Sequence, residues 1–140
     1  MASTTAFLQN NWLLILVLFL SGAMLLFPLV QRRFGPAKDI GTLNVTHLIN
    51  HQDALVLDVR ETAEYQGGHL PHAVHIPLSQ LGSRGNELAR HVARPVIAYC
   101  ASGNRSRMAG SALAKLGFKD IYNLHGGYKA WRDAGLPTEK

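Results

Sequence analysis

Apolar and polar positions divide this chain into one long apolar stretch and a region where short apolar runs alternate with mixed segments. Residues 12–30 are almost wholly apolar and are interrupted only by Ser21, Gly22 and Pro28. A helix over this stretch would nearly span the hydrocarbon core of a bilayer, which is about 30 Å thick. The pattern therefore predicts a single transmembrane helix and assigns residues 1–31 to an N-terminal anchor.

Short apolar runs in the second region are typical of buried strands, and the segments between them favour helices. The predicted strands are 42–43, 54–58, 74–76 and 96–99, and residues 120–123 lead into a last strand. The predicted helical segments are 44–50, 61–65, 87–91, 106–116 and 127–134. Strands that alternate with helices predict an α/β fold with a parallel sheet and helices on both faces. We therefore expect a linker over residues 32–41 and one folded domain over residues 42–137.

Two of these helices carry expectations about their caps and buried faces. Asn44 is expected to be the N-cap residue of the helix over 44–50. A loop is expected over residues 82–85, before the helical segment at 87–91. In the helix over 106–116, Met108, Leu113 and Leu116 are expected to face the sheet.

Cys100, the only cysteine, lies between the predicted strand 96–99 and the predicted helix 106–116. Ligands of open α/β sheets bind at the carboxyl ends of the strands, and a short loop of small residues can turn its N–H groups around an anion. The helix behind the loop adds unpaired N–H groups and the positive end of its dipole. We therefore expect the pKa of Cys100 to lie below its ordinary value. The residues expected to line this site are Ala101, Ser102, Gly103, Asn104 and Arg105, with Ser106 in support. The alternative is an inert, buried structural cysteine.

Further charged residues are expected close to Cys100. Asp58 and Arg60 follow the predicted strand 54–58, so they should lie at the same edge of the sheet. For Asp58 we favour a structural role in tying loops together. Arg60 could line the rim or attract an anionic donor, and Arg107 could reach the pocket mouth or lie in solvent.

Charge and residue counts exclude several classes of function. The net charge is +5, but the basic residues of the second region are scattered among acidic ones, without interleaved aromatic residues, so we predict no nucleic-acid partner. A single cysteine allows no internal disulfide, no Cys-x-x-Cys pair and no cysteine-based zinc site.

Three histidines, His69, His72 and His75, lie close together in the sequence. Pro71 interrupts any helix there, and alternation along a strand would not place all three side chains on one face. We therefore predict no metal site.

The flanks of residues 12–30 predict how the anchor is oriented. No Lys or Arg precedes the apolar stretch, whereas Arg32 and Arg33 follow it directly. Basic flanks stay in the cytoplasm, so the domain is expected to face the cytoplasm from the cytoplasmic membrane. A cleaved signal peptide is the alternative, but a basic start and a good cleavage site are missing.

The loop Cys100-Ala101-Ser102-Gly103-Asn104-Arg105-Ser106 resembles the active-site loop of the rhodanese family of sulfurtransferases. Other stretches agree in the family's order: Leu57-Asp58-Val59-Arg60-Glu61 with Glu64-Tyr65, Gly68-His69-Leu70-Pro71, His75-Ile76-Pro77, and Leu124-His125-Gly126-Gly127 with Ala130-Trp131. The resemblance covers about residues 39–137. One departure is His72, where the family usually has Gly. It concerns the backbone conformation of this turn and not the chemistry.

This resemblance implies a rhodanese-like fold and covalent sulfur transfer without a metal or organic cofactor. The thiolate of Cys100 would take the outer sulfur of a small anionic donor such as thiosulfate and pass it from a persulfide to a thiol or protein acceptor. Backbone N–H groups of residues 101–105 would hold the persulfide, and Arg105 would bind the donor's oxyanion. Gly126 and Gly127 are expected to serve turning and close packing.

Two other functions remain open from the sequence. A related fold with a Cys-x5-Arg loop hydrolyses phosphate esters, but only four residues separate Cys100 from Arg105, and the smaller cradle suits sulfur better than a phosphoryl group. The other is a binding module that uses this fold and its anchor to dock on a membrane protein partner.

Overall fold

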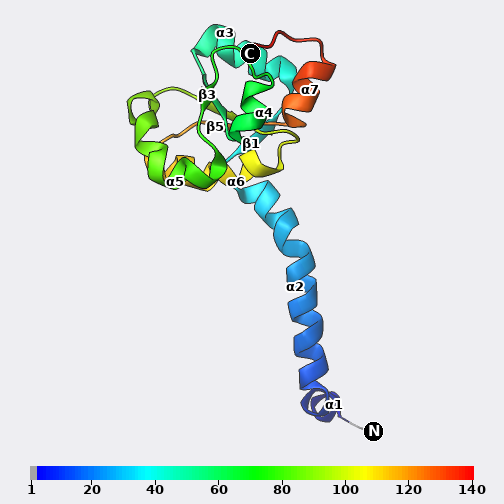
Figure 1. Ribbon diagram of the computed structural model, residues 1–140. Helices are drawn as coiled ribbons and strands as arrows, with labels where there is room; N and C mark the ends of the chain where they lie inside the picture. Colours follow the sequence, from blue (N-terminus) through cyan, green and yellow to red (C-terminus); the bar gives the residue numbers. More distant parts are fainter. Residues whose placement is uncertain (1–2) are drawn as a thin grey trace. The chain divides into compact units, whose positions relative to one another are not determined.

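The computed structural model describes residues 3–140, with side-chain surroundings for all of these except residues 31–34 (Figure 1). The chain divides into two compact units, Met1–Gly35 and Pro36–Lys140. Arg32 and Arg33, on which the predicted orientation depends, lie outside the described side chains.

The first unit consists of two helices, α1 over Thr4–Asn10 and α2 over Trp12–Phe34. The hydroxyl of Ser3 caps α1 by accepting the N–H of Ala6 at 3.3 Å. Within α2, residues Trp12–Val30 have a mean hydropathy of 2.8, and this helix is long and apolar enough to cross a membrane. A helix of this kind near the N-terminus fits a membrane anchor and a signal sequence alike.

The second unit is built on a parallel five-stranded sheet in the order β1-β5-β4-β2-β3, which confirms the predicted α/β fold. The strands are β1 (Lys38–Ile40), β2 (Leu55–Asp58), β3 (Val74–His75), β4 (Val96–Tyr99) and β5 (Ile121–Leu124). Because β4 lies at the centre, between β2 and β5, its carboxyl end is surrounded by the ends of both neighbours. Cys100 follows β4 directly at this position.

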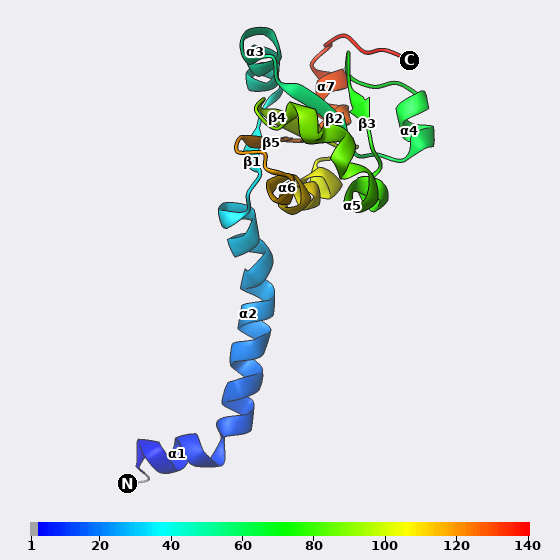
Figure 2. The same cartoon turned by 90° about the vertical axis from the view of Figure 1, so that its left-hand side faces the viewer.

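Helices cover both faces of the sheet, as predicted (Figure 2). They are α3 (Thr42–Gln52), α4 (Thr62–Gln66), α5 (Leu81–Arg84), α6 (Asn104–Leu116) and α7 (Gly127–Asp133), with 3₁₀ segments η1 (Leu78–Gln80) and η2 (Gly85–His91). Strand alternation decides which core each residue enters. Ala98 of β4 packs with Leu113 of α6, whereas Ile97 belongs to the opposite cluster with Val45 of α3 and Trp131 of α7.

The predicted edge strand at residues 42–43 is wrong, because the edge strand is β1 at Lys38–Ile40. It pairs with β5 in the register Asp39↔Asn123, a contact between distant parts of the chain. Thr42 already begins α3, and Gly41 rather than Asn44 occupies its N-cap position.

Two details of the other helices also differ from the prediction. Residues Leu81–Arg84 form a helical turn instead of a loop, because Leu81 is buried in the core. Met108 does not face the sheet: its side chain is 71% exposed, whereas Ala109 and Leu113 are buried. The reason is close packing of α6 at Gly110, where an added Cβ would approach the Cβ of Ala37 to 2.9 Å.

The turn at His72 adopts the left-handed conformation that glycine favours, with φ 58°. The N–H of His72 donates to the Glu139 carboxylate at 3.2 Å. The turn therefore keeps the backbone that a glycine would adopt, although His72 replaces it.

Candidate active site

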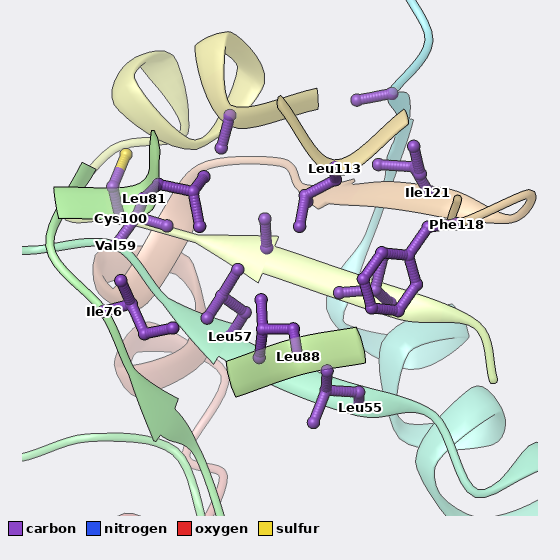
Figure 3. Close-up of a cluster of buried hydrophobic side chains, with 14 residues drawn as sticks. Leu55, Leu57, Val59, Ile76, Leu81, Leu88, Cys100, Leu113, Phe118 and Ile121 are labelled. Carbon is purple, nitrogen blue, oxygen red and sulfur yellow. The ribbon is translucent and has the colours of Figure 1, made fainter. Parts of the chain in front are cut away.

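The sulfur of Cys100 lies inside the loop that joins β4 to α6. Cys100 is 1% exposed and belongs to the margin of the core cluster that also contains Val59 and Leu81 (Figure 3). Its Sγ accepts the backbone N–H of Gly103 at 3.1 Å, and the hydroxyl of Ser106 lies 3.4 Å away. Gly103 is the N-cap residue of α6 and Ser106 lies in its first turn, so both donors stand at the N-terminus of this helix, where anions are favoured.

Gly103 allows the loop to turn so tightly. Its φ is 98°, and a Cβ at this position would approach the carbonyl oxygen of Leu124 to 3.2 Å. The glycine is therefore required both by the left-handed backbone and by the closeness of β5.

Hydrogen bonds lower the pKa of Cys100. Burial raises the pKa of the thiol, but the hydroxyl of Ser106 and the backbone N–H groups of Ser106, Ser102 and Gly103 outweigh it and lower the pKa below its ordinary value. Ser102 and Gly103 are thus among the donors, and the N–H of Ser106 is a further one. The carbonyl of Ala101 accepts the N–H of Lys129 at 3.2 Å, and Asn104 is an exposed residue at the start of α6.

A chain of hydrogen bonds reaches the sulfur from β1 and β5. The Asn123 amide donates from Nδ2 to Asp39 Oδ1 at 2.8 Å and to the carbonyl of Gly103 at 3.1 Å. Its Oδ1 is therefore turned toward Ser106, whose hydroxyl donates to it. Since a hydroxyl carries one proton, Ser106 donates either to Asn123 or to the sulfur of Cys100, and a negative charge on the sulfur favours the second arrangement.

The start of α7 supports the loop from the other side. The N–H of Tyr128 donates to the carbonyl of Cys100 at 2.7 Å. Gly126 and Gly127 have φ values of 76° and 60°, and a Cβ at Gly127 would lie only 2.7 Å from the carbonyl of Ala101. The two glycines thus provide the turn and the close approach that place α7 against the loop.

Asp58 and Arg60 form a buried ion pair beside the site. The guanidinium of Arg60 donates to both carboxylate oxygens of Asp58, at 2.7–3.1 Å, and to the carbonyl of Gly68 at 2.7 Å. The hydroxyl of Tyr99 also donates to Asp58, at 2.6 Å. Arg60 is 3% exposed and lies over the ring of Tyr128, so a role for Arg60 in binding a donor does not agree with its position. Its position is that of a structural residue that joins β2, β4 and α7.

The guanidinium of Arg105 is paired with a carboxylate. Its two terminal nitrogens donate to the two oxygens of Glu64 in α4, at 2.8 and 2.9 Å. This hydrogen bonding raises the pKa of the Arg105 guanidinium and lowers that of Glu64 to about 2. The oxyanion of a donor would therefore compete with Glu64 for Arg105. Arg107 is paired as well, since it donates to Asp39 at 2.7 Å.

The three clustered histidines have different neighbours. His69 and His75 stack on the ring of Tyr65, and their ring nitrogens contact the carbonyls of Tyr65 and Arg60. His72 lies in the exposed turn described above. The imidazoles of His69 and His75 therefore make separate contacts around α4 and β3, whereas His72 contacts Glu139 through its backbone N–H.

A groove of about 680 Å³ lies at the opposite end of β2 from the cysteine loop. Leu55, Arg94 and Trp131 are among the residues that line it. The residues of the cysteine loop, Cys100–Ser106, do not belong to its lining. The loop, and not this groove, holds the Cys100 thiol with its lowered pKa and the backbone N–H groups that donate to it.

The sequence alone did not predict Glu64, Asn123 or Asp39 as parts of the site. A signal was available for Asn123, because a polar residue in an otherwise apolar strand at the same sheet edge as Cys100 indicates a buried hydrogen-bonding role. Glu64 carried no such signal, since glutamate in a short helical turn is most often exposed.

Comparisons with known proteins identify the family. The family model for the rhodanese-like domain matches residues 44–134. Thiosulfate sulfurtransferase GlpE of Coxiella burnetii is 31% identical over 101 residues, which are 72% of this chain and 92% of that protein. The crystal structure of a rhodanese-related protein from Thermoplasma volcanium matches with a TM-score of 0.65 and 29% identity, over 73% of this chain and 97% of that one.

Uncharacterized protein YqhL of Bacillus subtilis is 46% identical over 81 residues, which are 58% of this chain and 63% of that protein. The chain thus spans less than two thirds of the length of YqhL, and about half of protein slr1261 of Synechocystis. Because the family model covers more than half of the chain and the solved structure shares its fold, this protein belongs to the rhodanese-like domain family and is related to sulfurtransferases.

Proposed function

We propose that this protein is a membrane-anchored sulfurtransferase that carries sulfane sulfur as a persulfide on Cys100. The observation that carries the proposal is the sulfur of Cys100, which lies within hydrogen-bonding distance of Gly103 N–H and the Ser106 hydroxyl at the start of α6. These donors stabilise the thiolate, which is the nucleophilic form of cysteine. Relatives named as sulfurtransferases, from Coxiella burnetii and Allochromatium vinosum, support this chemistry over hydrolysis.

The reaction proceeds in two covalent steps. The Cys100 thiolate attacks the outer sulfur of the donor, the donor's S–S bond breaks, and the remainder leaves with the electron pair of that bond. The persulfide anion on Cys100 keeps its charge beside the N–H groups of the loop. A thiol acceptor then attacks the outer sulfur and regenerates the Cys100 thiolate. Because Cys100 is 1% exposed, small or slender donors fit this site best.

The test is mass spectrometry of the full chain in detergent after incubation with thiosulfate or an organic thiosulfonate. We expect one added sulfur atom on Cys100, released by a thiol reductant, and none on the Cys100→Ser variant. That variant should also fail to convert cyanide to thiocyanate while keeping the circular dichroism of the wild type. Sulfur transfer by Cys100→Ser, or no sulfur on wild-type Cys100 with any donor, would contradict the proposal. The second result would favour the binding module that docks on a membrane protein.

The membrane part of the proposal rests on α2 and on the basic flank predicted from the sequence. Trp12–Val30 would cross the bilayer, and the charge asymmetry supports a domain that faces the cytoplasm. A reducing cytoplasm also suits a reactive thiol. Fusion of alkaline phosphatase, which is active only outside the cytoplasm, to Lys140 should give no activity, whereas a cytoplasmic reporter should be active. An active phosphatase would reverse the orientation, and a soluble protein without its N-terminal helix would show a cleaved signal.

A further inference from the structure

The three arginines that were expected close to Cys100 are each paired with a carboxylate. Arg60 contacts Asp58, Arg105 contacts Glu64, and Arg107 contacts Asp39, each at 2.7–2.8 Å. Each pair is electrically balanced, so the positive charge that the sequence predicted around Cys100 is neutralised within the folded domain. Only the Arg105–Glu64 pair combines a residue of the cysteine loop with an exposed position, since its side chains are 37% and 35% exposed.

The carboxylate of Glu64 is held in place twice. It accepts both terminal nitrogens of Arg105, and it also accepts the backbone N–H of Glu61 at 3.2 Å in a capping box at the start of α4. The low pKa of Glu64, about 2, means that this carboxylate is negative at every physiological pH. A fixed negative charge therefore stands beside the one loop arginine that could attract an anion.

The Arg105–Glu64 pair affects how strongly the site attracts donors of different charge. A dianion that approaches the Cys100 thiolate is already repelled by that charge, and attraction to Arg105 is offset by Glu64. We propose that Glu64 makes the site discriminate against dianionic donors, so that Cys100 takes sulfur from organic persulfides or thiosulfonates more readily than from thiosulfate. This inference rests on the proposed sulfurtransferase function and specifies its substrate class.

Each kind of donor can transfer one sulfur atom to Cys100 while its own S–S bond breaks. With thiosulfate, the Cys100 thiolate forms an S–S bond to the outer sulfur and sulfite leaves with the electron pair. With methanethiosulfonate the same bond forms and methanesulfinate leaves. With a persulfide, the thiolate of the donor leaves and the persulfide proton stays with the transferred sulfur or passes to solvent.

Methanethiosulfonate and thiosulfate form a matched pair of probes, because a methyl group replaces one charged oxygen while the reacting S–S bond is kept. The measured quantity is the ratio of kcat/KM for thiosulfate to kcat/KM for methanethiosulfonate, with cyanide as acceptor and the full chain in detergent. Any change in the pKa of Cys100 affects both donors and cancels in this ratio. Glu64→Gln and Glu64→Ser should each raise the ratio at least about tenfold, because Arg105 is then free to attract the second charge.

Asp53→Asn is the matched control. Asp53 is also a carboxylate paired with an arginine, Arg94, but it lies before the amino end of β2, at the opposite edge of the sheet from Cys100. Asparagine tolerates the left-handed backbone of Asp53, where φ is 49°. This variant loses the same unit of charge and should keep the ratio of the wild type.

The competing hypothesis predicts the opposite sign. If Glu64 only positioned Arg105 to bind the oxyanion of thiosulfate, its removal would lower the ratio. A ratio that falls, or that changes less than about threefold in the Glu64 variants, overturns the inference. Added salt gives a check without mutation, since screening should raise the ratio in the wild type, and a fall would overturn the inference as well. Absence of sulfur on wild-type Cys100 with both donors would instead refute the proposed function itself.

Discussion

Replacement of Ser106 by alanine should raise the pKa of Cys100, because it removes the only side-chain hydroxyl within hydrogen-bonding distance of the sulfur among the described residues. A hydrogen bond to a charged group contributes about 1.5–3 kcal/mol. The value here belongs at the lower end, because the hydroxyl is 3.4 Å from the sulfur and shares its single proton with Asn123. About 1.5 kcal/mol corresponds to an increase of about one pKa unit.

The same substitution should also destabilise the fold. Asn123 is fully buried, and its Oδ1 faces the Ser106 hydroxyl while its Nδ2 is held by Asp39 and Gly103. Loss of the hydroxyl leaves a buried amide oxygen without its donor, which costs about 1–3 kcal/mol. We therefore expect Ser106→Ala to lower both the reactivity of Cys100 and the free energy of unfolding.

The assay is the rate of alkylation of Cys100 by iodoacetamide against pH, which reports the thiolate fraction directly because no other cysteine is present. The matched control is Ser102→Ala, which removes a hydroxyl from the same loop but keeps the Ser102 N–H that lowers the pKa of Cys100. A shift below about 0.3 unit in Ser106→Ala, or an equal shift in the control, would refute the reasoning. The backbone N–H groups would then activate Cys100 alone.

Two further predictions concern the support of the loop. Gly127→Ala should destabilise the domain by about 2–3 kcal/mol in urea unfolding and disturb alkylation of Cys100, because the new Cβ meets the loop carbonyls in a left-handed backbone. Gly135→Ala is the control, because Gly135 has a φ of 70° but open space around it, so this variant should show only the cost of backbone strain. Equal losses of stability in the two variants would contradict the packing argument. Hydrogen bonds from Arg105 lower the pKa of Glu64 from 4.5 to about 2, so this ion pair stabilises the fold above about pH 5 and its contribution is lost as the pH falls toward 2. Since the pair is about one-third exposed, we expect the free energy of unfolding to fall by about 1 kcal/mol over this pH range. Glu64→Gln should remove this part of the pH dependence of the urea midpoint. An unchanged pH dependence in the variant would argue against a stabilising role of the pair.

The position of Cys100 between a strand and a helix was predictable from local patterns. A short apolar run before Cys100 and a segment of helical spacing after it define a strand, a loop and a helix, and these signals depend on neighbouring residues only. The loop residues and Ser106 were identified in the same way, and the resemblance to rhodanese loops needed only a contiguous stretch of sequence. The long apolar stretch before the domain was equally clear, because hydropathy over 19 residues depends on composition alone.

The electrostatics of the site were decided by the tertiary structure. The partner of Arg105 is Glu64, which is 41 residues away in the sequence, and Asn123 binds Asp39 across a separation of 84 residues. Such pairs arise where parallel strands and their loops end at one edge of a sheet, so neither periodicity nor spacing along the chain predicts them. The edge strand β1 was misplaced for the same reason, since its position depends on pairing with the distant β5. The sequence thus determined the place of Cys100 and its loop, whereas long-range contacts determined which charged groups lie around them. The reason is that local patterns report which residues are buried and not which distant groups they meet.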